Sequence, residues 1–326
     1  MSQSSKILIV NTNVENIKFL DELLAKSGFL VFSAFNIEEA IRKAEEARVD
    51  VVIVDSSGDI NVIDFLKSFR QELSGSFVPV VILIKTEDSE TKSKAISLGV
   101  DCILRLPVDN DEVIAAANSL SAIKSLREEI ERIEDVFYGL VKIIDSKDAY
   151  TKGHSERVTK MSKMLAQNLS LSPDKVRLIE KAAKLHDIGK IGVPENILNK
   201  PGALSKEEYE QIKMHPVISE KICSSLPSLQ PVLGIIRHHH ERYDGKGYPD
   251  GLKAEKIPLE SRIISVVDCF DAMATDRPYR PRLPKERIIA IFEAGAGTQW
   301  DKEIVEVFLK MIRSNAFEKM ALYSED

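Results

Sequence analysis

The chain is poor in several features that define large classes of proteins. Its 326 residues include only three cysteines, Cys102, Cys223 and Cys269, which form no pairable framework and favour a reducing cytoplasm. No stretch approaches the roughly 18 apolar residues of a membrane span, and the N-terminal residues lack the pattern of a secretory signal. The sequence therefore predicts a cytoplasmic protein that does not enter a membrane.

An excess of basic residues is also lacking. Lysine and arginine number 45 against 51 aspartates and glutamates, for a formal net charge of −6. Such a balance argues against a surface that holds long nucleic acid, although bound metal ions could still attract a small anionic substrate. The length predicts two domains, and a hydrophobic content of 44% is sufficient for a buried core in each.

Histidine is missing from the whole N-terminal part of the chain. All six histidines fall at residue 154 or later, and His186 is followed directly by Asp187. They are His154, His186, His215, His238, His239 and His240. Imidazoles and carboxylates gathered in this way suit borderline divalent metals such as Fe, Mn, Zn or Ni. The distribution predicts a metalloenzyme whose centre lies in the C-terminal half.

The N-terminal half alternates between apolar strand candidates and helical periods. The strand candidates are residues 6–10, 49–55, 78–84 and 99–107, and the first predicted helix is 13–27. Continuous runs rich in valine and isoleucine, separated by helices, are typical of a parallel sheet covered on both faces. We expect a doubly wound α/β domain over residues 1–118, and a purely structural role for it remains open.

This pattern, with Asp55 at the end of a buried strand, resembles the flavodoxin-like receiver domain of response regulators. The resemblance implies that Asp55 occupies the phospho-acceptor position. Asn11 and Thr12, however, stand where the family has its Mg²⁺-binding acids, and Leu106 stands in place of its lysine. Phosphoryl transfer depends on such cations and donors. We therefore predict a degenerate receiver that is not phosphorylated and that serves dimerisation or the docking of a signalling protein.

A linking helix is predicted over residues 119–144. Seven apolar residues there follow alternating steps of three and four: Ile123, Leu126, Ile130, Ile133, Phe137, Leu140 and Ile144. This spacing is typical of a coiled coil and favours a homodimer formed through the receiver domain and this helix. The alternative is that the same stripe packs onto the chain's own catalytic domain.

The remaining residues, 145–326, are predicted to be mainly helical. His186 and Asp187 are adjacent on a predicted helix, and Lys190 follows on the same face. Asp268 is an acid within an apolar run, which requires a compensating charge. Because a carboxylate can bind two ions at once, Asp187 is the natural bridge of a two-metal site.

Long motifs in this half resemble those of the HD-GYP phosphodiesterases. They are HDIGKIGVPENILNKPG, HHERYDGKGYPDG and DCFDAMATDRPYR. The resemblance implies an all-α helical bundle of the HD type that hydrolyses cyclic di-GMP to pGpG, and in some members on to GMP, with a hydroxide between two metal ions. Two alternatives stay open: a catalytically weak binding or docking module, and a phosphodiesterase for another cyclic dinucleotide such as cyclic GMP-AMP.

The resemblance also assigns individual residues. It implies that one ion is held by His154, His186, Asp187 and Asp268, and the other by Asp187, His215, His239 and His240. It gives Asp187 and Lys190 catalytic roles, and it places Lys190, Gly247, Tyr248 and Arg277 in contact with the substrate. Fe or Mn is expected, with Zn, Ni or Mg as alternatives. A third ion is not expected, because Tyr150 stands where some members have a glutamate.

Overall fold

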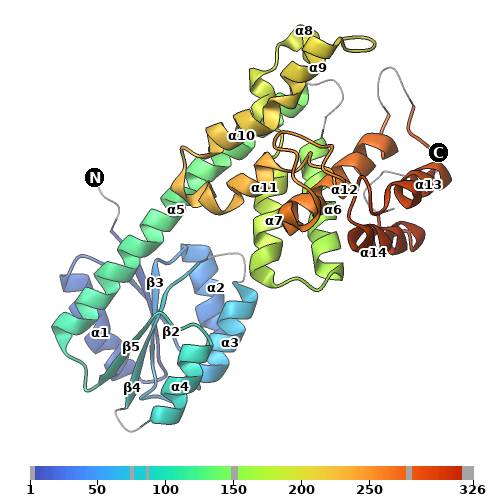
Figure 1. Ribbon diagram of the computed structural model, residues 1–326. Coiled ribbons are helices and arrows are strands. Elements are labelled where there is room, and N and C mark those ends of the chain that lie inside the picture. The colour runs from blue at the N-terminus through green and yellow to red at the C-terminus, as the bar shows by residue number, and fades with distance from the viewer. Residues whose placement is uncertain (1–3, 74–76, 86–87, 148–152, 277–280, 318–326) are drawn as a thin grey trace. The chain divides into compact units, whose positions relative to one another are not determined.

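A computed structural model describes residues 4–73, 77–85, 88–147, 153–276 and 281–317. The chain divides into two compact units, Met1–Arg132 and Ile133–Asp326. The first is an α/β unit and the second is helical, so the predicted combination of fold classes is confirmed (Figure 1). Among the described residues, none of the helices combines the length and the apolar character that a membrane span requires.

The α/β unit is built on a five-stranded parallel sheet with the strand order β2-β1-β3-β4-β5. Its strands are β1 (Lys6–Val10), β2 (Leu30–Ala34), β3 (Val51–Asp55), β4 (Val80–Lys85) and β5 (Cys102–Leu106). The helices between them are α1 (Val14–Lys26), α2 (Ile37–Ala47), α3 (Val62–Glu72) and α4 (Ser89–Ser97). The three central strands are buried almost throughout, which explains why their sequences are continuously apolar.

Alternate residues of each strand serve two separate cores. Ile7 and Ile9 face the core formed with α1, whereas Leu8 and Val10 face the core formed with α2 and α3. Both faces of the sheet are therefore covered, as the sequence predicted. Asp55 is the last residue of β3 and lies at the carboxyl edge of the sheet.

The helix α5 (Asn110–Lys147) is 38 residues long and includes the predicted linking helix. Its early residues Val113, Ala117 and Leu120 belong to a core of the α/β unit. Near its end, Val141 and Ile144 are buried in the core of the helical unit, and Phe137 packs against that core. Ile123, Leu126, Ile130, Ile133 and Leu140 are exposed, with Leu126 at 61%. Thus Phe137 and Ile144 of the predicted stripe pack onto the chain's own domain, and its other five residues remain at the surface.

Over its described residues, the helical unit continues through nine α-helices and three short 3-10 helices. They are α6 (His154–Asn168), α7 (Pro173–Leu185), η1 (Ile188–Gly192), α8 (Glu195–Leu198), α9 (Lys206–Lys213), α10 (His215–Cys223), η2 (Pro227–Val232), α11 (Leu233–Arg237), η3 (Ala254–Lys256), α12 (Leu259–Ala274), α13 (Lys285–Gly295) and α14 (Lys302–Arg313). Phe270, Phe292 and Phe308 are fully buried, and the ring of Phe308 makes edge-on contacts with the other two. These rings join α12, α13 and α14, so α12 is held firmly behind the candidate site.

Candidate metal centre

His186 and Asp187, the HD pair, lie at a break between two helices. We predicted His186 and Asp187 on one continuous helix, and that prediction is wrong: α7 ends at Leu185, and the 3-10 helix η1 begins at Ile188. Asp187 has left the α-helical conformation, with φ −100° and ψ 3°. The break turns the Asp187 carboxylate toward the imidazole of His215, while its other oxygen stays near His186.

Close contact between η1 and α10 explains why the helix breaks there. A Cβ at Gly189 would overlap the carbonyl oxygen of His215 and the backbone of Ser219. Ser219 also bridges the two segments, because its hydroxyl donates to the His186 carbonyl and accepts from the Gly189 N–H. This packing fixes the positions of His186 and His215 relative to each other.

Three histidines have their ring tautomer set by the backbone. The Nδ1 atoms of His186, His215 and His239 lie 2.8, 2.7 and 2.6 Å from the carbonyl oxygens of residues three positions earlier. Because a carbonyl only accepts, each Nδ1 carries a hydrogen, and in the neutral form of the ring the lone pair lies on Nε2. Neutral imidazoles held in this form are suited to bind a metal through Nε2.

His154 is held differently, by a carboxylate. Its Nδ1 lies 2.7 Å from Oδ2 of Asp271, which is buried on α12. Arg157 donates to both oxygens of Asp271, at 2.6 and 2.9 Å. On its other side, His154 Nε2 lies 3.2 Å from Oδ1 of Asp268. The ring of His154 is therefore clamped between two acids of one helix.

Asp187 stands between two groups of histidines. Its Oδ2 lies 3.7 Å from His154 Nε2 and 3.5 Å from His186 Nε2, whereas its Oδ1 lies 3.2 Å from His215 Nε2. The ligand atoms of two sets each fall within 4.8 Å of one another. These sets are His154, His186 and Asp187, and Asp187, His215, His239 and His240. Asp268 joins the first through its contact with His154, so all seven predicted ligands are brought to one centre.

The electrostatic state of the centre suits a cation. Burial would raise the pKa of Asp187, but Lys190, His186 and His215 hold it well below the usual range, so the carboxylate is ionised. Burial and the imidazole of His215 lower the pKa of His240 to about 3, and burial with His240 lowers that of His239. Both rings are neutral at pH 7.

His154 behaves in the opposite way. Burial would lower its pKa, but hydrogen bonds to Asp268 and Asp271 raise the pKa to about 10. Nδ1 donates to Asp271, so the additional proton is carried at Nε2, beside Asp268. A cation bound at this position therefore replaces that proton, and metal uptake is expected to release it.

One unpartnered nitrogen and one close pair of nitrogens indicate that the donors fit a metal. Within the described part of the chain, His186 Nε2 is buried and has no hydrogen-bond partner. The Nε2 atoms of His215 and His239 lie 3.4 Å apart, and the backbone bonds at the two Nδ1 atoms hold both rings in this orientation. Lone pairs that face each other repel unless a cation lies between them. The nitrogen and carboxylate donors are those that Fe, Mn and Zn accept.

Lys190 lies at the edge of this cluster. Its Nζ is 2.7 Å from Asp187 Oδ2, and the side chain is 15% exposed. A lysine that keeps its charge beside a bridging carboxylate can reach an incoming phosphate without leaving the centre.

The loop after the histidine triplet lies against the second histidine group. The ring of Tyr248 is 4.9 Å from that of His240, and Lys213 Nζ lies 5.9 Å above the Tyr248 ring. A Cβ at Gly247 would overlap the backbone of Glu241 and Arg242, so close packing alone requires a glycine there. Tyr248 thus has a place beside the centre, and Gly247 allows the loop to approach.

His238 falls outside the cluster. His238 turns away, with Nδ1 bonded to the carbonyl of Gly234 and Nε2 2.8 Å from Asp250 Oδ2, in keeping with its expected status as the non-ligand of the triplet. Arg277 and Tyr150 lie outside the described residues.

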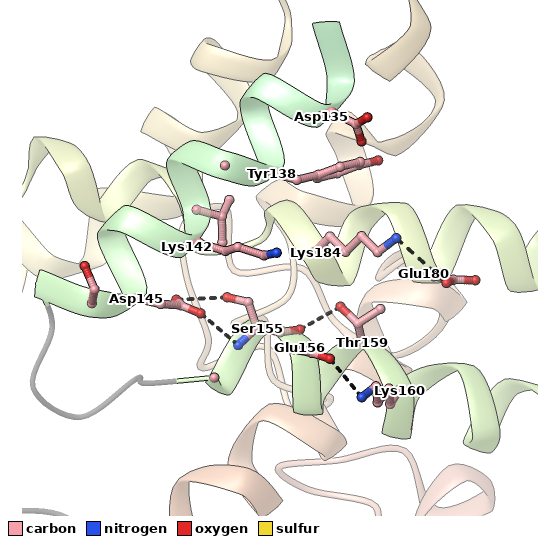
Figure 2. A pocket seen from close by; sticks show the side chains of 14 residues that line it. Asp135, Tyr138, Lys142, Asp145, Ser155, Glu156, Thr159, Lys160, Glu180 and Lys184 are labelled. Atoms are coloured by element: carbon pink, nitrogen blue, oxygen red, sulfur yellow. Dashed lines mark hydrogen bonds and ion pairs between the residues drawn. The ribbon is translucent and has the colours of Figure 1, made fainter. Parts of the chain in front are cut away.

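The start of α6 is anchored by the end of α5. Asp145 accepts hydrogen bonds from the backbone N–H and the hydroxyl of Ser155, at 3.2 and 3.0 Å (Figure 2). Ser155 directly follows His154, so this carboxylate caps the helix that carries the ligand. A cavity of about 860 Å³ lies beside this contact and is lined by α5, α6 and α7, without any of the seven predicted ligands.

Asp145, Arg157 and Asp271 were missed by the sequence analysis. Asp271 follows Asp268 by three residues and Arg157 follows His154 by three, so each lies about one turn from a predicted ligand. A second acid in the apolar helix that carries Asp268 was the available signal for Asp271. Nothing local marks Asp145, because its partner is eight residues beyond the end of α5.

Two families match this chain in separate regions. The HD domain family matches residues 140–304, and the response regulator receiver domain family matches residues 7–118. The first match includes all seven predicted ligands, and the second includes the parallel sheet except Lys6, the first residue of β1.

Several curated proteins are similar over most of the chain. A cyclic di-GMP phosphodiesterase of Thermotoga maritima is 34% identical over 94% of this chain and 90% of its own length. The cyclic di-GMP phosphodiesterase response regulator RpfG of Xanthomonas campestris is 32% identical over 83% of this chain and 78% of its own. A 3′3′-cGAMP-specific phosphodiesterase 3 of Vibrio cholerae is 37% identical over 55% of this chain and 39% of its own length.

Proposed function

This chain belongs to the HD domain family and carries an N-terminal receiver domain, and we propose that it is a metal-dependent phosphodiesterase that hydrolyses cyclic di-GMP. Two relatives that align with most of the chain bear that name. We place the reaction in the cytoplasm, where the three free cysteines would remain reduced.

One observation carries the proposal: the two oxygens of Asp187 face two different groups of histidines. A carboxylate with this orientation can hold two ions side by side. When bound, a pair of divalent ions polarises phosphoryl oxygens and generates a nucleophile from water near neutral pH. We propose two ions, Fe or Mn, with Zn, Ni and Mg as the alternatives, held by the seven predicted ligands.

The chain's own residues would orient the substrate and balance its charge. Lys190, beside Asp187, would bind a non-bridging phosphate oxygen and compensate the charge that develops on it. Tyr248 would pack against a guanine or its ribose at the rim, since one of its ring neighbours, His240, is a candidate ligand. We keep Gly247 and Arg277 as further substrate contacts.

The test compares the rates at which the protein hydrolyses different cyclic dinucleotides. The protein is purified without oxygen and analysed for its metal content. We expect two divalent ions per chain and hydrolysis of cyclic di-GMP to pGpG, with the formation of GMP measured separately. The similarity to a cGAMP-specific enzyme makes 3′3′-cGAMP the competing substrate, and a higher kcat/KM for it would change the assignment. Metal-loaded protein that binds cyclic dinucleotides without cleaving them would instead indicate a binding module.

We also propose that the protein is a homodimer that associates through the exposed part of the α5 stripe. Ile123, Leu126, Ile130 and Ile133 are all at least 42% exposed and keep the alternation of three and four. A continuous apolar stripe of this kind is costly to leave in water, and a second copy presents an identical one.

Substitution of both Leu126 and Ile130 by glutamate should therefore convert the dimer to a monomer. The two added charges per chain would face each other across the stripe and repel. Sedimentation equilibrium measures the change, and Glu131→Gln on the exposed face of the same helix is the control. A doubly substituted protein that remains dimeric would place the interface elsewhere.

The receiver unit is proposed to act without phosphorylation. Both oxygens of Asp55 are occupied by neutral donors: Asn11 Nδ2 lies 2.5 Å from Oδ2, and the Ser57 N–H lies 2.8 Å from Oδ1. Asn16 Nδ2 adds a longer contact of 3.3 Å to Oδ2. Two neutral amide side chains thus contact Asp55, and one of them, Asn11, stands at a position where the receiver family has a Mg²⁺-binding acid.

We expect no phosphorylation of the full-length protein by acetyl phosphate and Mg²⁺, because no acid pair is present to hold the ion next to Asp55. Intact mass spectrometry should show no added phosphoryl group, and Asp55→Asn should hydrolyse cyclic di-GMP at the wild-type rate. Stoichiometric labelling that Asp55→Asn abolishes would show that the receiver is functional.

A further inference from the structure

The two candidate cation positions differ in the groups that hold their imidazoles from behind. At His215 and His239, Nδ1 donates to a neutral backbone carbonyl. At His154, Nδ1 donates to the carboxylate of Asp271, at 2.7 Å. Asp187 is common to both positions, whereas Asp268 lies 3.2 Å from His154 Nε2 and reaches His240 Nδ1 only at 4.0 Å.

Asp271 is rigidly placed for this contact. It is 1% exposed, and Arg157 binds it with a forked pair of hydrogen bonds, from Nε to Oδ1 at 2.6 Å and from the terminal nitrogen to Oδ2 at 2.9 Å. Arg157 and His154 are on α6, and Asp271 and Asp268 are on α12. The same carboxylate therefore joins the two helices and supports one imidazole.

A carboxylate behind a metal-binding imidazole fixes the ring's orientation and increases the electron density that Nε2 offers to a cation. A backbone carbonyl also fixes the ring's orientation, but it increases the electron density at Nε2 less than a carboxylate does. We propose that Asp271 is a positioning residue that makes the site of His154, His186, Asp187 and Asp268 the tighter of the two, so that this site fills first. The inference rests on the proposed metal centre and adds an order of loading to it.

The test is a titration of the metal-free, full-length protein with Mn²⁺ alone, without oxygen and followed by calorimetry. We expect two steps in the wild type, and His240→Ala should remove only the weaker one. Asp271→Asn keeps a hydrogen-bond acceptor but loses the charge. It should weaken the tighter step by about 10–100-fold and leave the other within about threefold, given the usual effect of such partners on metal affinity.

The chain offers a matched control. His238, Asp250 and Arg237 form a similar group, with His238 Nε2 2.8 Å from Asp250 and Arg237 donating to both Asp250 oxygens, at 2.7 and 2.8 Å. His238 is not a predicted ligand. Asp250→Asn should therefore leave both Mn²⁺ steps unchanged.

A purely structural role for Asp271 predicts a different result. Asp271→Asn would then lower the melting temperature of the metal-free protein and weaken both steps equally, which would overturn the proposal. Equal wild-type affinity at both steps would overturn it as well, while leaving the proposed function intact. A wild-type protein that binds fewer than two Mn²⁺ would instead contradict the metal centre itself. If Asp271→Asn fails to fold, Arg157→Lys should show a smaller weakening of the tighter step only, and an unchanged tighter step in that variant would overturn the inference.

Discussion

Asp187→Ala should abolish hydrolysis and leave the protein unable to retain either metal ion. Asp187 is the one residue that belongs to both groups of ligands, with one oxygen facing each. Its removal also leaves the Lys190 ammonium beside the remaining histidines, where it repels cations. Loss of both ions removes several kcal/mol of transition-state stabilisation, so we expect kcat/KM to fall by about 10³-fold or more.

Elemental analysis and the cyclic di-GMP assay on the same preparation measure this effect. Asp174→Ala is the control, because Asp174 lies in the first turn of α7 with 83% of its side chain exposed and pairs only with Arg177 at the surface. That variant should keep two ions and the full rate. Turnover at the wild-type rate by metal-free Asp187→Ala would end the proposed mechanism.

Lys190→Met should reduce turnover by about 10²–10³-fold while both ions remain bound. Methionine keeps most of the length of the side chain and removes the ammonium, so the substrate phosphate loses one charged donor in the transition state. The loss should be mainly in kcat, because the metal ions still bind the ground-state phosphate. Lys190 also helps to hold the pKa of Asp187 low, so some weakening of metal binding is expected in addition.

Steady-state kinetics at saturating Mn²⁺ separates these two effects. Lys200→Met is the matched control. The Lys200 ammonium binds both oxygens of Glu208, at 2.9 and 2.7 Å, and neither residue is a predicted ligand. Lys190→Arg should recover part of the rate by restoring the charge. A Lys190→Met enzyme with unchanged kcat would assign the phosphate contact to another residue.

The α/β unit was largely predictable because its pattern is local. Strands such as Val51–Asp55 and Val80–Lys85 are buried on both faces, so burial appears in the sequence as an unbroken apolar run. The stripe on α5 was only partly predictable. The spacing alone could not show that Phe137 and Ile144 pack into the helical core while Leu126 stays exposed, because both outcomes have the same heptad pattern.

The sequence by itself determined the chemistry of the candidate centre. It indicated that imidazoles and carboxylates are the ligands, and it identified the pair His186 and Asp187, the acid Asp268 and the loop that carries Gly247 and Tyr248. Only the tertiary structure decided how they are arranged. The break after Leu185 depends on the contacts of Gly189 with His215 and with Ser219, which is 30 residues later in the chain, and no local spacing encodes such contacts. The clamp of Asp271 and Arg157 on His154 depends on α12 lying beside α6. Ligand identity is a property of single side chains, whereas ring orientation, protonation and the shared position of Asp187 arise from contacts between segments that are distant in the chain.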